Sequence, residues 1–226
     1  MRFFQPFSGG AQVGERVVDF ATLVMLQKKI PLECPIRLIP FLNDPLAFMG
    51  EPELDEKQAR LKACLKDIGA GEDVLAATDA SLKLIRQAEK QLEQALSALN
   101  RFFSGYECAG RGSLFQTSPT EMKNTLWLEA FRQLGEYELT LQAHVSLDLK
   151  PEWAQLLVLS KERKEEMAQA MKFFDKHGWD FKELPGPGNH VYILEKAEPA
   201  QSTLEELLKS AREAAADLEK KFSAAS

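Results

Sequence analysis

The feature that most constrains the fold is a long stripe of mostly apolar side chains between residues 72 and 103. Its positions are spaced alternately by three and four residues: Leu75, Thr78, Leu82, Ile85, Glu89, Leu92, Leu96, Leu99 and Phe103. This heptad-like spacing is typical of a helix that packs along one seam. It predicts one continuous helix over about residues 72–103. Glu89 is the charged member of the seam, and it has three readings: it reaches outward to solvent, marks a bend, or fixes the register against a basic partner.

A second stripe with the same spacing lies near the C-terminus, at Leu204, Leu208, Ala211, Ala215, Leu218 and Phe222. It predicts a helix over about residues 202–222, with Ser202 or Thr203 as its N-cap. The two helices could pair antiparallel within the chain, which the sequence slightly favours, or between two copies. The candidate interaction residues are those of the first seam: Leu82, Ile85, Leu92, Leu96, Leu99 and Phe103.

Strict alternation replaces the helical period between residues 138 and 149. Apolar side chains at odd positions alternate with polar ones, which predicts a strand with one buried and one solvated face. The runs 179–184 and 190–195 flank a Pro-Gly-Pro-Gly-Asn loop and predict a hairpin. The apolar run 153–159 fits a strand or the start of a helix, and we favour a strand.

Further helices are predicted over residues 14–29, 53–68, 118–134 and 162–177, and a glycine-rich loop over residues 105–112. The proline-rich stretch 31–52 is predicted to be irregular, with a possible short strand at 36–42. The fold class is therefore α+β: an antiparallel sheet covered by helices, with the long helix and the C-terminal helix forming a coiled-coil-like arm. We divide the chain into an N-terminal segment packing on the core (1–71), the long helix (72–104) and an α+β core (105–226), which together form one structural unit.

Charge and cysteine content exclude several classes of protein. The 34 acidic residues outnumber the 28 basic ones, and no dense basic block occurs, so binding to nucleic acid is not expected. Cys34, Cys64 and Cys108 are far apart in the sequence and predict neither a disulfide framework nor a metal site. No stretch is long and apolar enough to span a bilayer, and the N-terminus lacks the apolar core of a signal peptide. We expect a soluble, cytoplasmic protein without a cofactor.

Histidine chemistry is limited to His144, His177 and His190. His144 falls on the polar face of the strand over 138–149, where a surface imidazole is the simplest reading. His177 lies near a predicted helix C-terminus, where a cation interacts favourably with the helix dipole. His190 follows the glycine loop of the hairpin at the start of a strand, where a ligand can approach it. It is the candidate catalytic residue.

Residues 167–194 carry a predicted helix that ends at His177-Gly178-Trp179, followed by the hairpin with His190-Val191-Tyr192-Ile193. This segment resembles the small HicA-type mRNA-cleaving toxins, in which a helix ends in a Gly-Trp-like pair and a hairpin presents the catalytic histidine on a double-stranded-RNA-binding type of fold. The resemblance implies that His190 acts as general acid or base in RNA cleavage. The chain departs from the family pattern because Gly188-Asn189 precedes the histidine and no third strand follows Glu195.

Two functions follow from these patterns. The favoured one is a non-enzymatic protein–protein interaction or assembly protein that acts through helical surfaces and self-association. The alternative is a nucleic-acid-processing hydrolase centred on His190.

Overall fold

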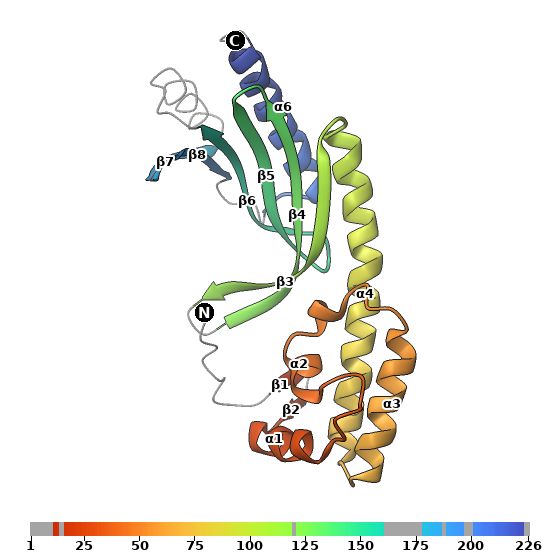
Figure 1. The fold of residues 1–226 in the computed structure, drawn as a ribbon. Helices are drawn as coiled ribbons and strands as arrows, with labels where there is room; N and C mark the ends of the chain where they lie inside the picture. The colour runs from red at the N-terminus through yellow and green to blue at the C-terminus, as the bar shows by residue number, and fades with distance from the viewer. Residues whose placement is uncertain are drawn as a thin grey trace. The chain divides into compact units, whose positions relative to one another are not determined.

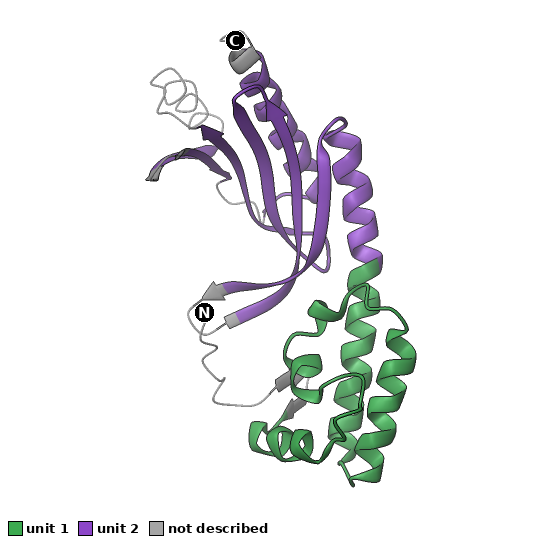
Figure 2. Ribbon diagram, viewed as in Figure 1, with its two compact units in different colours: residues 1–89 green, residues 90–226 purple. Residues whose placement is uncertain are grey.

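The computed structural model describes residues 11–13, 16–118, 121–160, 178–186, 189–196 and 201–223. The chain forms two compact units, residues 1–89 and residues 90–226 (Figure 2). The boundary falls inside the long helix α4, Glu72–Phe102. Figure 1 shows α4 as one uninterrupted helix, which agrees with the helix predicted over 72–103.

Unit 1 is mainly helical. A short antiparallel pair, β1 (Ala11–Val13) and β2 (Arg16–Val18), precedes α1 (Phe20–Lys29), α2 (Leu38–Asn43), the 3-10 helix η1 (Pro45–Phe48) and α3 (Leu54–Asp67). These elements enclose an apolar core with the first part of α4, to which α4 contributes Val74, Leu75, Ala77 and Ile85. The predicted helix over 53–68 is confirmed by α3.

Two predictions in unit 1 are corrected. The first helix begins at Phe20 rather than at Gly14, because Asp19 caps it by accepting a hydrogen bond from the backbone N–H of Thr22 at 3.0 Å. The possible strand over 36–42 is instead the helix α2. Pro40 is compatible with that helix because it lies in the first turn, where backbone N–H groups have no partner within the helix.

Unit 2 contains a six-stranded antiparallel sheet in the order β3-β4-β5-β6-β8-β7. Its strands are β3 (Glu107–Ser118), β4 (Glu121–Leu134), β5 (Tyr137–Ser146), β6 (Pro151–Ser160), β7 (Trp179–Gly186) and β8 (Asn189–Lys196). Together with the helices, this sheet confirms the α+β class.

The loop predicted over 105–112 and the helix predicted over 118–134 are both wrong, because β3 and β4 occupy these residues. In β4, the buried side chains Leu126, Leu128 and Ala130 alternate with Trp127 and Glu129, so the period is two rather than three and four. In β3, Gly110 allows the side chain of Leu92 in α4 to pack directly against the strand backbone. A Cβ atom at Gly110 would lie only 2.7 Å from Cδ1 of Leu92, a residue of α4.

The strand predicted over 138–149 is confirmed as β5 up to Ser146, after which the chain turns. The Ser146 hydroxyl accepts hydrogen bonds from the backbone N–H groups of Asp148 and Lys150, at 3.3 and 3.1 Å. Leu149 has a φ of 59° in this turn. The strand expected over 153–159 is β6, and the expected hairpin is β7 with β8, closed by the pair Gly186 and Asn189. The helix predicted over 162–177 lies outside the described residues.

The C-terminal helix α6 (Leu204–Ser223) agrees with the prediction over 202–222. Thr203 and Glu206 form a reciprocal capping box: the backbone N–H of Thr203 donates to Glu206 at 2.8 Å, and that of Glu206 donates to the Thr203 hydroxyl at 3.2 Å. Further along α6, the carboxylate of Glu219 accepts hydrogen bonds from Tyr106 at 2.6 Å and from Arg132 at 3.0 Å.

Both helices of unit 2 pack on one face of the sheet (Figure 1). After position 89, α4 supplies Ala95 and Leu99 to the unit 2 core, and Phe103 follows directly after the helix. The helix α6 supplies Leu204, Leu207, Leu208, Ala211, Ala214, Ala215 and Leu218. From the sheet come alternate residues of β4, β5, β6 and β8. The stripe of α6 and the part of the α4 stripe after residue 89 therefore pack in one core with the strands.

Candidate functional site

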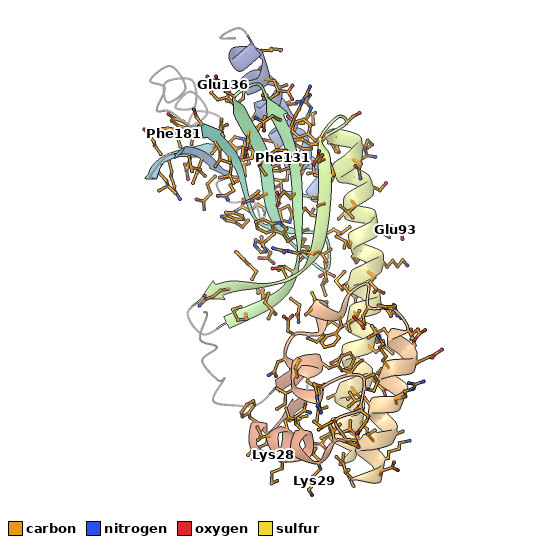
Figure 3. All side chains as sticks on the ribbon, in the orientation of Figure 1. Lys28, Lys29, Glu93, Phe131, Glu136 and Phe181 are labelled. Atoms are coloured by element: carbon orange, nitrogen blue, oxygen red, sulfur yellow. The ribbon has the colours of Figure 1, made fainter. Side chains whose placement is uncertain are left out.

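The sheet of unit 2 has a second face, whose side chains are outside the core formed with α4 and α6. We call it the open face, and Figure 3 shows side chains projecting from both sides of the strands. Polar and aromatic residues share it. The polar residues set it apart from the face beneath the helices, whose core is apolar.

The strand register brings one residue from each of four strands into a single row across the open face. Arg111 pairs with Trp127, Trp127 with His144, and His144 with Trp153. We call these four residues the aromatic row. Because neighbouring strands lie about 4.8 Å apart, side chains opposite each other in such a row make contact.

The rings of the row pack against one another. The His144 ring lies 4.7 Å from the ring of Trp127 and 5.8 Å from that of Trp153, centroid to centroid. Phe115 of β3 stacks on the His144 ring at 4.3 Å between centroids. The two indole rings are stacked at 6.3 Å with an interplanar angle of 23°. Since both tryptophans are only partly buried, part of this cluster faces solvent.

Hydrogen bonds fix the two indoles. The Trp127 Nε1–H donates to Glu129 at 3.3 Å, and the Trp153 Nε1–H donates to Glu195 at 3.1 Å. Glu195 is in turn paired with Lys182. The aromatic surface is therefore held in one arrangement before anything binds to it, which lowers the entropic cost of binding.

His144 is half-buried, and its environment keeps it neutral. Burial, and secondarily the positive charge of Arg111, lower the pKa of His144 from 6.5 to about 4. Its Nδ1 lies 3.2 Å from the hydroxyl of Thr125, which is fully buried. A general acid or base works best with a pKa near the operating pH. At neutral pH, His144 is therefore better suited to act as an aromatic surface than as a proton carrier.

The structure describes the backbone of the candidate catalytic residue His190, whose pairing partners are Ser160 and Pro185. Its side chain is outside the described part, and so is the whole of His177. A catalytic His190 would need a carboxylate such as Glu183 or Asp180 within hydrogen-bond reach. Glu183 pairs with Tyr192, two residues along β8 from His190, whereas Asp180 pairs with Glu195, five residues along and roughly 16 Å of strand away. The carboxylate of Asp180 is therefore not its neighbour, and the catalytic role of His190 stays a prediction.

The six candidate interaction residues are divided between the two units. Leu82 and Ile85 pack in the core of unit 1, and Leu92, Leu96, Leu99 and Phe103 pack in the core of unit 2. Ile85, Leu99 and Phe103 are fully buried. The seam side chains thus already have partners within the chain.

Sequence reasoning missed most of the aromatic row. Trp127 lay within an expected helix and Arg111 within an expected loop, so their place on the open face was not foreseen. The available signal was the alternation of Leu126, Leu128 and Ala130 with their polar or aromatic neighbours, which is a strand period. His144 was correctly assigned to the polar face of its strand.

Within the described ranges, no three or more His, Cys, Asp or Glu side chains gather in a way that could hold a metal ion. The same part of the chain contains no helix with the length and hydropathy needed to cross a membrane. No protein-family model matches the sequence, and neither a curated protein nor a solved structure matches it significantly.

Proposed function

We propose that this chain is a non-enzymatic assembly protein that pairs with a second copy of itself through the open face of the unit 2 sheet. The observation that carries the proposal is the aromatic row, Arg111–Trp127–His144–Trp153. Tryptophan and arginine are enriched among the residues that dominate binding energy at protein interfaces. Here both tryptophans are partly exposed and hydrogen-bonded to neighbouring carboxylates, and Arg111 is exposed.

The order of residues across the sheet favours a second copy as the partner. His144 lies on β5, with Trp127 on β4 to one side and Trp153 on β6 to the other. A two-fold axis parallel to the strands at His144 would place β4 of one copy opposite β6 of the other. In that arrangement Trp127 meets Trp153 twice, as an isologous interface requires.

The charges follow the same symmetry. On the open face Arg111 lies on β3, one strand beyond Trp127, and Glu195 lies on β8, one strand beyond Trp153. The same axis brings β3 of one copy opposite β8 of the other. Glu195 pairs with Gln155, two residues along β6 from Trp153, so each Arg111 would lie roughly 7 Å along the strands from the opposite Glu195, a distance that the long arginine side chain can span. The face is therefore complementary to itself in charge as well as in aromatic character.

This proposal keeps self-association but moves it from the helices to the sheet. The reason is that the seam side chains of α4 and the stripe of α6 pack within the two cores. A contact through those stripes would require the helices to leave the cores.

The test measures the molar mass of the full chain in solution by light scattering after size-exclusion chromatography. We expect about twice the 25.4 kDa of a single chain. Arg111→Glu and Glu195→Arg should each shift the protein towards the monomer, because each places like charges opposite each other. The double variant should recover dimer, at least in part, since the exchanged charges attract again.

Recovery in the double variant would have to come from contact between copies. Within one copy Arg111 and Glu195 are four strand spacings apart, or roughly 19 Å, which is too far for a direct ion pair. Leu32→Ala is the matched control, because Leu32 is 81% exposed and lies in unit 1. A wild-type protein that has the mass of one chain at every concentration, or a double variant no more dimeric than the single ones, would refute the proposal.

A further inference from the structure

Exposed apolar side chains gather on α1 and on the turn that follows it. Among the described residues, five large apolar side chains are exposed, and three of these lie between positions 20 and 32. They are Phe20 at 37%, Met25 at 61% and Leu32 at 81%. Single exposed apolar residues need no explanation, but a group of them on one short segment marks an interaction surface.

The outward side of α1 lacks the charged residues that a surface helix usually carries there. Leu23 and Leu26 face the core of unit 1. Because residues three and four apart share a helix face, the opposite side carries Ala21, Met25 and Lys28, all of them exposed. The first two turns of α1 contain no charged residue at all. Contact with water alone does not account for this composition.

Leu32 lies at the tip of a tight turn just after α1. The backbone N–H of Cys34 donates to the carbonyl of Pro31 at 3.1 Å, which closes the turn around Leu32 and Glu33. Turn tips usually carry Gly, Asn, Asp, Ser or Pro. A leucine at this tip contributes little to the core of unit 1, so its side chain is free to enter an apolar phase outside the protein.

Basic groups border these apolar side chains. Lys28 and Lys29 end α1, and Figure 3 shows both side chains projecting outward from unit 1. Neither lysine pairs with a carboxylate within the described part of the chain. Arg37 donates to the carbonyl of Pro31 at 3.5 Å, which brings its guanidinium to the turn. Glu33 is the only acidic residue between positions 20 and 40, so this surface is positive although the whole chain has a net charge of −6.

We propose that α1 and the turn after it dock unit 1 on an anionic lipid membrane, with Met25 and Leu32 entering the headgroup region and Lys28 and Lys29 binding lipid phosphates. Charge complementarity supports this partner, because each lysine close to an anionic bilayer strengthens binding about fivefold. A protein partner fits this surface less well, since interfaces between proteins are depleted in lysine and enriched in Tyr, Trp and Arg. The surface belongs to unit 1, so the inference does not depend on a dimer through the open face.

The experiment mixes the full-length protein with sucrose-loaded vesicles of phosphatidylcholine and phosphatidylserine, sediments the vesicles, and measures the bound fraction over a range of lipid concentrations. Vesicles of phosphatidylcholine alone are the comparison. We expect binding to the mixed vesicles that weakens as the salt concentration rises, and little binding to the neutral vesicles. Lys28→Gln combined with Lys29→Gln should weaken binding to the mixed vesicles about 25-fold, a factor of about five for each lysine.

Two further variants separate this surface from a general attraction of lysines to the membrane. Leu32→Gln should weaken binding about tenfold, because it removes an apolar side chain that the bilayer would bury. The matched control is Lys83→Gln with Lys90→Gln, which removes the same charge from exposed positions of α4 and should bind as the wild type does. Circular dichroism will show whether each variant is folded.

Three results would overturn the proposal. The first is that the mixed vesicles sediment without the wild-type protein. The second is that the variant without Lys28 and Lys29, or the Leu32→Gln variant, binds as tightly as the wild type. The third is that the α4 control loses as much binding as the variant without Lys28 and Lys29.

Discussion

A substitution at Gly110 tests whether the stripe of α4 packs against the sheet. Gly110 lies in β3, and a Cβ atom built there would stand 2.7 Å from Cδ1 of Leu92. The same atom would stand 3.2 Å from Cδ2 of Leu96 and from Cδ2 of Leu128. Leu92 and Leu96 are seam residues of α4. Gly110→Val therefore places three extra carbon atoms in space that the predicted seam already occupies.

The expected loss of stability follows from two opposing effects. Overfilling a packed core costs about 3 kcal/mol at the upper end of its usual range, and three close contacts justify that end. Valine favours strands more than glycine does, and it also restricts the conformations of the unfolded chain. These two effects together offset about 1 kcal/mol of that destabilisation. We therefore expect the free energy of unfolding of unit 2 to fall by about 2 kcal/mol.

Tryptophan fluorescence makes the measurement specific to unit 2, because all three tryptophans, Trp127, Trp153 and Trp179, follow residue 89. Urea unfolding followed by this signal should show a lower midpoint for Gly110→Val with an unchanged slope. With a slope of about 2 kcal/mol per molar urea, the midpoint should drop by about 1 M. The comparison with wild type must use the same protein concentration.

The control introduces the same valine side chain elsewhere on the same strand. Ala109 is exposed and adjacent to Gly110, and its side chain points to the opposite face. Ala109→Val should leave the midpoint unchanged or raise it slightly. If Gly110→Val unfolds at the same urea concentration as Ala109→Val, the seam of α4 does not pack on β3, and pairing of the stripe with another helix becomes the better explanation.

Two further predictions concern unit 2. Because the folded-state pKa of His144 is about 4 and the unfolded value is 6.5, the unfolded chain binds more protons between these values. The free energy of unfolding should be highest above pH 6.5 and should fall as the pH drops towards 4. Between pH 6.5 and 5, the urea midpoint of His144→Gln should therefore change less than that of the wild-type protein. Glu219→Gln should lower the free energy of unfolding by about 2 kcal/mol, because it weakens hydrogen bonds from Tyr106 and Arg132 to a charged acceptor. Glu213→Gln, at an exposed position on the same helix, should leave thermal unfolding unchanged, and equal effects of the two substitutions would contradict the assigned role of Glu219.

The elements that could be predicted are those whose period is unambiguous. The long stripe gave α4, the capping residues and second stripe gave α6, and the alternation after residue 137 gave β5. In each case the buried positions repeat over enough residues to separate a period of about 3.5 from a period of two. The turn after Ser146 was missed because its apolar residues continue the alternation beyond the strand.

The strands β3 and β4 could not be predicted in the same way. The glycines of β3 suggested a loop. Gly110 instead lies in a strand where α4 packs closely against it, and this contact can be seen only in the tertiary structure. Ser118 and Glu121 have the spacing of a capping box, which predicts a helix start although these residues belong to strands. The aromatic row depends on strand register between distant segments, so no local pattern in the sequence contains it.

Spacing by three and four shows that a helix has one apolar face, but not what covers that face. In a coiled coil one partner follows the whole stripe. Here the covering surface changes along α4: Ile85 is buried in the core of unit 1 and Leu99 in the core of unit 2. Glu89 lies where the stripe passes from one core to the other. It accepts hydrogen bonds from Arg86 at 2.7 Å and from the backbone N–H of Gly50 at 3.0 Å, and its side chain stays 27% exposed. A carboxylate is tolerated at this seam position because neither core encloses it. Glu89 is therefore not a defect in a coiled-coil seam. It marks the position along α4 where one core ends and the other begins.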